Sequence, residues 1–278
     1  MEIKNFFENL KSNLRLKHIF GHLTEKKLLS IAKYNKYLQK RMNMDINDYI
    51  NYIRIEIELF PKLISKKNYF INIPEKERNY FRIYFNDEKK EIYRTYFTEK
   101  DKIKKIKIEI KYEVKSLAEL FDECECIEKL NFIKCKTKNI TNMNNMFSKC
   151  KSLKELNIDV LKTDNVTDMS FMFANCSSLI ELNLNNFNTK NVNNMSGIFS
   201  GCNSLKKLYF KNFNTSNVTD ISMMFYDCSS LSELDIDSFK NFNTDKVINR
   251  KDFSKYCENG KITGKKPKYL TYTLSLYD

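Results

Sequence analysis

Three stretches of the chain carry one phrase: MNNMFSKCKSLKELNI at 143–158, MSFMFANCSSLIELNL at 169–184 and MSGIFSGCNSLKKLYF at 195–210. The phrase advances by 26 residues each time. Five cysteines keep the same step without a slip: Cys124, Cys150, Cys176, Cys202 and Cys228. A fixed period between about 20 and 50 residues is the signature of stacked repeats. The sequence therefore predicts a repeat protein, a class that commonly acts by presenting an extended surface.

Each repeat is expected to hold one short helix and one short strand. Apolar residues fall at i, i+3, i+4 and i+7, the spacing of one helix face, as in Met143, Met146, Phe147 and Cys150. The residue before this face has a side-chain oxygen suited to capping a helix: Asn142, Asp168, Asn194 or Asp220. Alternation in Leu156/Ile158 then indicates a strand with one buried face. Stacking would join the strands into a parallel sheet, which predicts an α/β leucine-rich-repeat-like solenoid.

Two longer phrases resemble the BspA-like leucine-rich repeats of surface proteins: FNTKNVNNMSGIFSGCNSLKKLYF at 187–210 and FNTSNVTDISMMFYDCSSLSELDI at 213–236. The resemblance covers roughly residues 113–239. It implies a binding solenoid without catalysis, often adhesive and located at the cell surface.

The chain is expected to comprise four segments. They are an N-terminal helical region at 1–52, a β-rich linker and cap at 53–112, the repeats at 113–259, and a C-terminal loop with a closing strand at 260–278. In the cap, alternating residues predict strands at 53–59, 81–85 and 106–110, and a hairpin whose turn lies at 86–89, between runs 80–85 and 92–97. The strand at 106–110 is predicted to open the repeat sheet. Gly260 and Gly264 indicate a loop before the closing strand at 269–277.

The N-terminal region is predicted to form short helices, the third beginning at Asp45 or Asn47. The run LKHIFGHLTEKKLLSIAKYNKYLQKRM at 16–42 is similar to an F-box in its Ile19-Phe20-x-x-Leu23 step and its Leu28-Leu29 pair, but it lacks the leading Leu-Pro and the Trp. This resemblance implies a Skp1-like partner. The alternative is a helical cap on the open end of the repeats, or a separate helical domain.

Charge is uneven along the chain. Lys and Arg outnumber Asp and Glu by 26 to 15 over residues 1–112 and by 9 to 4 over 240–278, whereas acids lead by 16 to 13 over 113–239. A basic flank suits nucleic acid or an anionic membrane, but a bias toward Lys, Asn, Ile, Tyr and Phe throughout the chain is the simpler explanation, and we expect no nucleic-acid partner. The mixed N-terminus is unlike a signal peptide, and no apolar run is long enough to span a membrane. A cytoplasmic protein is therefore expected, with the cell surface as the alternative that the resemblance implies.

The cysteines are expected to be buried thiols rather than disulfides or metal ligands, because one falls at the same core position in every repeat. The only histidines are His18 and His22, far from Cys124 and Cys126. We therefore expect no metal and no cofactor. The sequence also contains no glycine-rich phosphate loop and no nucleophile–base spacing, so we expect no enzymatic activity and no catalytic residue.

Residues that alternate with the buried strand positions are the candidate binding face. By repeat, these are Glu155, Asn157 and Asp159; Glu181, Asn183 and Asn185; Lys207, Tyr209 and Lys211; and Glu233, Asp235 and Asp237. Tyr209 between two lysines is a favourable interface anchor. The simpler interpretation is charge complementarity between neighbouring strands of a solvated sheet.

Three functions fit these observations. The first is a non-catalytic protein that binds a protein partner on the sheet face. The second is an adaptor whose N-terminal helices recruit a ubiquitin-ligase scaffold. The third is a cell-surface adhesin of the BspA type.

Overall fold

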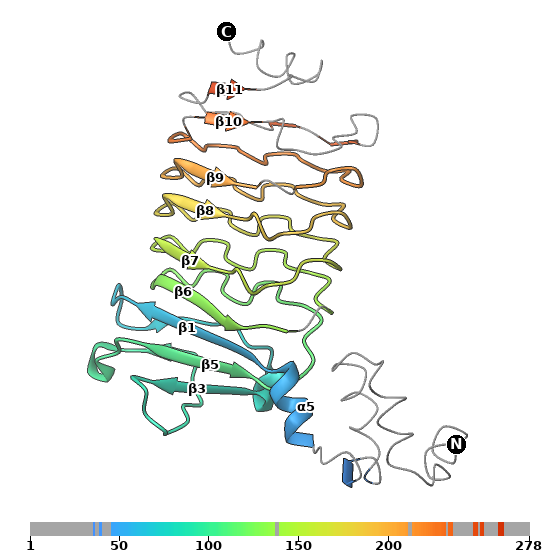
Figure 1. The fold of residues 1–278 in the computed structure, drawn as a ribbon. Coiled ribbons are helices and arrows are strands. Elements are labelled where there is room, and N and C mark those ends of the chain that lie inside the picture. The colour runs from blue at the N-terminus through green and yellow to red at the C-terminus, as the bar shows by residue number, and fades with distance from the viewer. Residues whose placement is uncertain are drawn as a thin grey trace, which may run out of the picture. The chain divides into compact units, whose positions relative to one another are not determined.

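A computed structural model of the 278-residue chain describes residues 36, 39–40, 46–136, 139–210, 213–231, 233–235, 247–249, 251–252 and 261–263. The chain forms two compact units, Met1–Arg54 and Ile55–Asp278. The described part is mostly strand and turn, with few short helices (Figure 1).

Within Met1–Arg54, the helix α5 spans Ile46–Ile53. The Arg54 amide donates to the Ile50 carbonyl at 2.9 Å and closes its last turn. The helix expected to begin at Asp45 or Asn47 is therefore present. The F-box-like segment 16–42 lies outside the described residues except for 36, 39 and 40, so it stays a prediction.

In Ile55–Asp278, one five-stranded sheet joins the cap to the first repeats. Its strands lie in the order β3-β5-β1-β6-β7. They are β1 (Ile55–Pro61), β3 (Phe81–Phe85), β5 (Ile106–Ile110), β6 (Ile127–Lys134) and β7 (Glu155–Asn157). All neighbours are antiparallel except β6 and β7, which are parallel. Ile57, Ile83 and Ile108 are in register and fully buried, so the alternation of the cap strands defines the core face.

The cap differs from its prediction in how the strands pair. Asn86 and Asp87 form the expected turn with positive φ, but β3 then makes only the isolated bridge Tyr84↔Glu91 with the following segment. The ladder partner of β3 is β5, and β4 (Tyr96–Phe97) pairs with β2 (Asn68–Tyr69). The 3₁₀ helices η1 (Glu75–Tyr80) and η2 (Glu99–Asp101) complete the cap.

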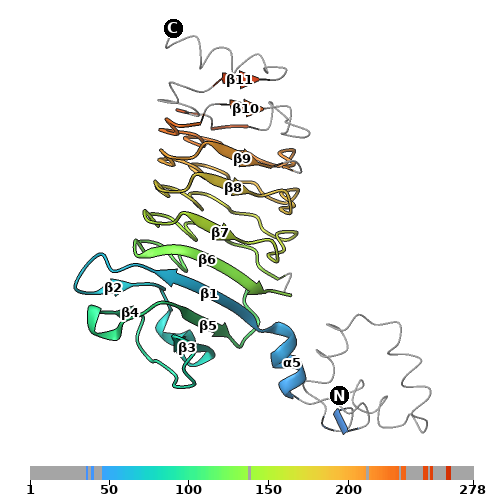
Figure 2. The ribbon, with the colours of Figure 1, turned by 60° about the vertical axis from the view of Figure 1, so that its left-hand side comes forward.

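The strand beside the first repeat is also not the predicted one. β1 lies between β5 and β6 and pairs antiparallel with both (Figure 2). A segment about 70 residues upstream in sequence therefore covers the edge of β6, and β5 does not open the repeat sheet.

The repeat strands continue with β8 (Glu181–Asn183), β9 (Lys207–Tyr209), β10 (Glu233–Asp235) and β11 (Lys261–Thr263). Parallel ladders join β6 to β7, β8 to β9, and β10 to β11. In the first two ladders the residues in register are 26 apart, as in Lys129↔Glu155 and Glu181↔Lys207. β11 lies where the sequence predicted a loop, and the predicted closing strand at 269–277 lies outside the described residues.

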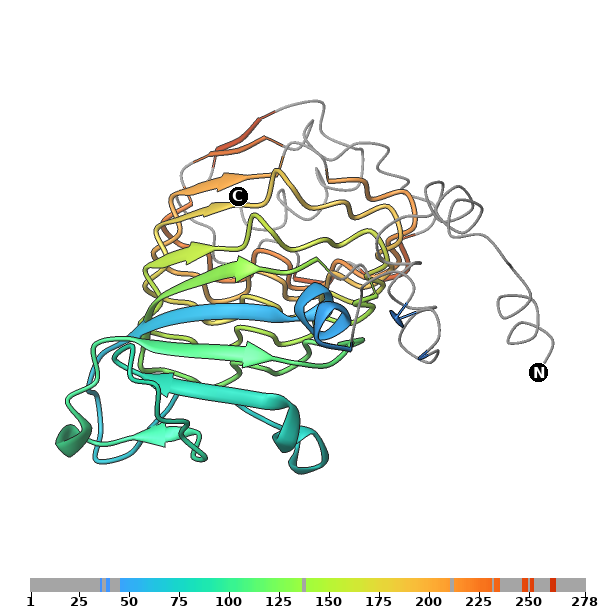
Figure 3. The same ribbon diagram turned by 60° about the horizontal axis from the view of Figure 1, so that its bottom comes forward.

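A second line of pairing runs along the repeats. Parallel bridges link Ser116, Asn142, Asp168, Asn194, Asp220 and Asn249 in succession. The chain runs out along each strand and returns along a segment of turns (Figure 3).

The helix predicted in each repeat is absent from the described repeats; its residues form consecutive turns. The amide of Phe147 donates to the carbonyl of Met172 in the next repeat at 2.9 Å, whereas the amide of Cys150 donates to Phe147, three residues back, at 3.1 Å. Amides thus alternate between the next repeat and a local turn. In an α-helix, each amide donates to the carbonyl four residues earlier in the same segment. Because half of these amides donate to the next repeat instead, an α-helix cannot form here. Asn145 and Lys149 take positive φ, and this spacing of four recurs in each repeat.

The residues predicted to cap helices form turns instead. Asp168 Oδ1 accepts the amide of Ser170 at 2.8 Å, and Asn142 Oδ1 accepts the amide of Asn144 at 2.8 Å. The predicted type of bond, from a side-chain oxygen to a nearby amide, is therefore present, but it starts an Asx turn rather than a helix.

A ladder of phenylalanines fills the core. Phe121, Phe147, Phe173, Phe199 and Phe225 stack with centroids 5.4–5.9 Å apart, and every ring is at most 1% exposed. The strand-side residues Leu153 and Ile158 belong to the same apolar cluster. The predicted core position of the repeated phrase is confirmed.

The cysteines run alongside this ladder. The described ones are buried, and none of them forms a disulfide. The thiols of Cys150, Cys176, Cys202 and Cys228 each donate to the carbonyl of a phenylalanine in the preceding repeat at 3.1 Å. Burial raises the pKa of Cys202 to about 12. These thiols therefore act as small buried groups that also satisfy a carbonyl, and Cys257 lies outside the described residues.

Candidate functional site

The predicted face residues point away from the core on three strands. Glu155, Asn157, Glu181, Asn183, Lys207 and Tyr209 are exposed, and they alternate with the inward leucines Leu156, Leu182 and Leu208. Asp159 is exposed and Asn185 half-buried just beyond the strands. Glu233 and Asp235 lie on β10, where only the backbone is described. Lys211 and Asp237 lie outside the described residues.

Charges on this face are matched between repeats. The Lys207 ammonium lies 4.0 Å from a Glu181 carboxylate oxygen, and Lys129 pairs with Glu155 at 2.5 Å. Three further pairs, in or next to the turns before β6 and β7, also join residues 26 apart: Glu123–Lys149, Glu125–Lys151 and Glu128–Lys154, at 2.5, 2.6 and 2.8 Å. Such exposed pairs contribute little to stability, because solvent and salt screen their charges. Complementarity between neighbouring strands therefore accounts for part of the face, including Lys207.

Two predicted site residues stabilise turns. Asn157 Oδ1 accepts the amide of Asp159 at 3.2 Å, and Asn183 Oδ1 accepts the amide of Asn185 at 3.0 Å. These bonds end the strands and hold Asp159 and Asn185 in position. The two asparagines therefore have a structural role on the face.

Tyr209 is the exposed aromatic residue among the described residues of β6–β9. Its side chain is 41% exposed, and it is in register with Asn183. Ile180, immediately before the neighbouring strand β8, is 52% exposed. Rigid aromatic and aliphatic surface between polar groups is the composition that protein interfaces favour.

The structure extends this face onto the cap, which the sequence did not indicate. Pairing between neighbouring strands places five residues in one row across the sheet: Tyr84, Lys107, Glu58, Asn131 and Asn157. The alternation in each strand indicated which residues point outward, but only the observed strand order places them beside the repeats.

Part of this cap surface is closely paired. Lys105 lies 3.6 Å from Glu58, and both Lys107 and Lys111 contact Glu109, at 3.0 and 3.3 Å. Burial, followed by the charge of Glu109, raises the pKa of Tyr84. The cap end of the face thus has little unmatched charge among these residues.

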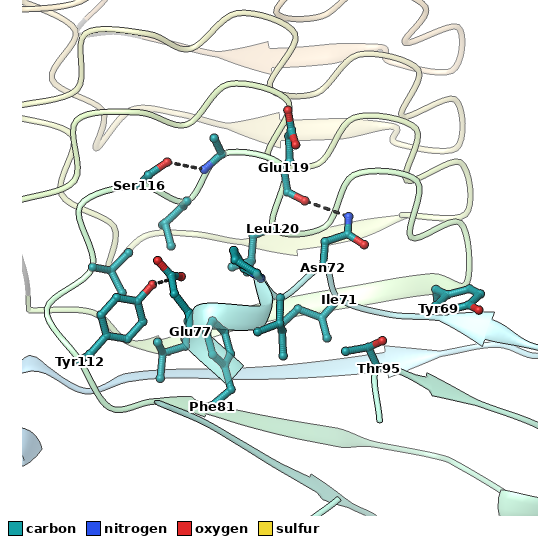
Figure 4. Close-up of a pocket in the computed structure, with 16 residues that line it drawn as sticks. Tyr69, Ile71, Asn72, Glu77, Phe81, Thr95, Tyr112, Ser116, Glu119 and Leu120 are labelled. Atoms are coloured by element: carbon teal, nitrogen blue, oxygen red, sulfur yellow. Dashed lines mark hydrogen bonds between the residues drawn. The ribbon is translucent and has the colours of Figure 1, made fainter. Parts of the chain in front are cut away.

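A cavity of about 530 Å³ lies elsewhere in the unit, between the 69–81 segment and the first repeat (Figure 4). The Tyr112 hydroxyl donates to Glu77, and burial raises the pKa of Tyr112. Asn72 donates to the carbonyls of Glu119 and Asp122 at 2.9 and 2.7 Å. These three polar side chains have partners in the protein, so the cavity marks where the cap packs on the repeats, and we assign it no ligand.

Two further findings concern only the described residues. No group of three or more His, Cys, Asp or Glu side chains gathers there in a way that could bind a metal. No helix in that part of the chain has the length and apolar character needed to cross a bilayer.

The 26-residue ladders and the exposed strand face define the class as a repeat protein. Comparison with family models then gives one match, to "Mycoplasma protein of unknown function, DUF285", over residues 115–233 and 175–260. The chain belongs to this family. Searches with the chain match neither a curated protein nor a solved structure.

Proposed function

We propose that this chain is a non-catalytic repeat protein that binds a protein partner on the outward face of β6–β9. The finer assignment within the repeat class is a leucine-rich-repeat-like solenoid of the BspA-like type. It is supported by the parallel strands, the inward leucines and the 26-residue register.

The observation that carries the proposal is the exposed position of Tyr209 on β9, a strand in register with β8 and part of the 26-residue repeat. Repeated strands present side chains at a fixed spacing, and such a surface suits an extended partner. Lys207 and Glu181 form a charged pair two positions before the tyrosine and would orient a polar partner beside it. The adaptor alternative depends on residues 16–42, which are mostly outside the described part.

The test compares matched pairs of variants in affinity purification of the full chain from its native cell. We expect Tyr209→Ala and Lys207→Glu to weaken capture of a partner by about tenfold or more, as anchor residues do. The controls are Tyr93→Ala, a 76% exposed tyrosine on the cap, and Lys190→Glu, an exposed lysine in a turn.

Tyr209→Ala, Tyr93→Ala and Lys190→Glu should keep the unfolding midpoint of the wild type, because the changed side chains are exposed. Lys207→Glu places a second carboxylate opposite Glu181, so it should lower the midpoint slightly without unfolding the chain. If the face variants capture the same proteins in the same amounts as their controls, the partner does not dock on this face and the proposal is wrong.

A further inference from the structure

The cap carries a short surface loop with an unusual composition. This segment, the basic loop, is residues 62–67, Lys62-Leu63-Ile64-Ser65-Lys66-Lys67, between β1 and β2 (Figure 2). Leu63 and Ile64 are 48% and 44% exposed, and the three lysines are exposed. The loop contains no acidic residue.

Exposed apolar surface concentrates here. Nine large apolar side chains are exposed among the described residues, and three of them lie between positions 62 and 69: Leu63, Ile64 and Tyr69. Single exposed apolar residues are ordinary, but a cluster edged by polar groups commonly marks an interaction site.

The fold fixes the loop in this conformation. The buried side chain of Asn68 accepts the amides of Ile64 and Ser65 at 2.9 and 3.0 Å, and donates to the Ser65 carbonyl at 2.8 Å. At the other end, the Lys62 amide donates to the Cys126 carbonyl at 2.8 Å. Leu63 and Ile64 therefore stay in solvent because backbone bonds on both sides prevent the loop from folding inward.

Aromatic and basic side chains also gather next to the basic loop. Tyr69 and Tyr96 pack with ring centroids 5.8 Å apart, and the Lys67 ammonium lies 4.3 Å from the Tyr96 centroid. Tyrosine with an apolar body and a polar tip suits the boundary between lipid tails and head groups. Lysines beside apolar side chains suit the same boundary, because anionic lipids attract their charge.

We propose that the basic loop docks the protein on an anionic membrane surface. Leu63 and Ile64 enter the interfacial layer, while Lys62, Lys66 and Lys67 contact lipid phosphates and carboxylates. This contact is peripheral, and it is separate from the strand face proposed for a protein partner.

The first test is co-sedimentation of the full chain with vesicles. Wild-type protein should sediment with phosphatidylcholine vesicles that contain 30% phosphatidylserine, but not with pure phosphatidylcholine. Lys66→Glu with Lys67→Glu should lower the partition coefficient by about tenfold or more, because each lysine near an anionic surface contributes roughly fivefold.

The matched control is Lys89→Glu with Lys90→Glu, two adjacent exposed lysines in the turn after β3. This pair makes the same change in net charge, so binding that arises only from the overall charge of +13 falls equally in both. An equal fall, or wild-type protein that does not sediment with anionic vesicles, overturns the proposal.

A second test measures insertion of the apolar tip. The chain contains no tryptophan, so Ile64→Trp introduces a single probe. Its emission should shift to the blue on addition of anionic vesicles and be quenched by brominated lipid. The control Ile180→Trp, at a 52% exposed site on the repeats, should show neither effect. If Ile64→Trp keeps the emission of an aqueous probe while the protein sediments, the loop does not enter the bilayer, and a contact with an acidic protein surface replaces this assignment.

Discussion

Replacing Phe173 by alanine should strongly destabilise the protein. Its ring is fully buried and stacks between Phe147 at 5.6 Å and Phe199 at 5.9 Å. Truncating a buried phenylalanine costs about 3–5 kcal/mol. A stacked aromatic pair contributes about 0.5–1.5 kcal/mol beyond its buried area, and this substitution removes two pairs. Because two stacked pairs are lost, we expect a loss in the upper half of the roughly 3–5 kcal/mol range, about 4–5 kcal/mol, a large part of the stability of a typical domain.

The position of Phe173 within the ladder provides a matched control. Phe121 is equally buried but stacks on one ring of the ladder, Phe147 at 5.7 Å. Phe121→Ala should cost about 1 kcal/mol less than Phe173→Ala, which is the contribution of one stacked pair. Tyr209→Ala, at an exposed aromatic position, should change stability by less than about 0.5 kcal/mol.

The assay is guanidinium unfolding of the full chain, followed by far-ultraviolet circular dichroism, with the free energy of unfolding extrapolated to water. A loss below about 1 kcal/mol for Phe173→Ala, far less than the roughly 3 kcal/mol expected at minimum, would show that the stacked ladder does not organise the core. A cost for Phe121→Ala equal to that for Phe173→Ala would show that stacking adds nothing beyond burial.

Two further predictions concern the thiols and a glycine. Burial raises the pKa of Cys202 to about 12, so the folded protein keeps this proton when an unfolded thiol, with a pKa of about 8.5, has lost it. The buried thiol therefore stabilises the protein fully below about pH 8.5, and this contribution is lost as pH rises toward 12. Unfolding midpoints measured across this pH range check the prediction, and a thiol reagent should label native Cys202 slowly. Gly197 has φ +56°, and a Cβ there would lie 2.3 Å from the Phe171 ring, so Gly197→Ala should cost about 1–3 kcal/mol. In a double-mutant cycle Phe171→Ala should relieve part of this cost, and additive effects would contradict the clash.

The sequence predicted the repeat period and the buried side chains well. Phe147 and Cys150 recur at a fixed step because each repeat packs against identical neighbours, so the same position must be apolar every time. Alternation in β7–β9 likewise indicated that Glu155, Glu181 and Lys207 point outward.

The predicted helix was wrong for an identifiable reason. The spacing of Met143, Met146, Phe147 and Cys150 fits one face of a helix, but a run of turns with left-handed residues at Asn145 and Lys149 places the same side chains in the core. Apolar spacing reports which side chains are buried, and it does not report where the backbone amides find their acceptors.

For the candidate face, too, the sequence predicted only part of what the structure shows. The asparagine at the end of a strand looked like a binding residue, but Asn157 and Asn183 hold turns through bonds to amides two residues away. The extension of the face to Glu58 and Lys107 depends on pairing between segments far apart in sequence. The residue type alone predicts neither these turn bonds nor the position of the cap residues beside the repeats, because both depend on contacts formed in the fold.

The amino-acid sequence by itself determined the step of 26 residues, the identity of the core side chains and the outward positions of the repeat strands, because burial must repeat wherever identical units stack. The tertiary structure decided the strand order of the cap, with β1 between β5 and β6, and the turns in place of helices. The physical reason is that a backbone amide bonds to the acceptor the fold brings close to it, and that acceptor often belongs to a neighbouring repeat or a distant strand.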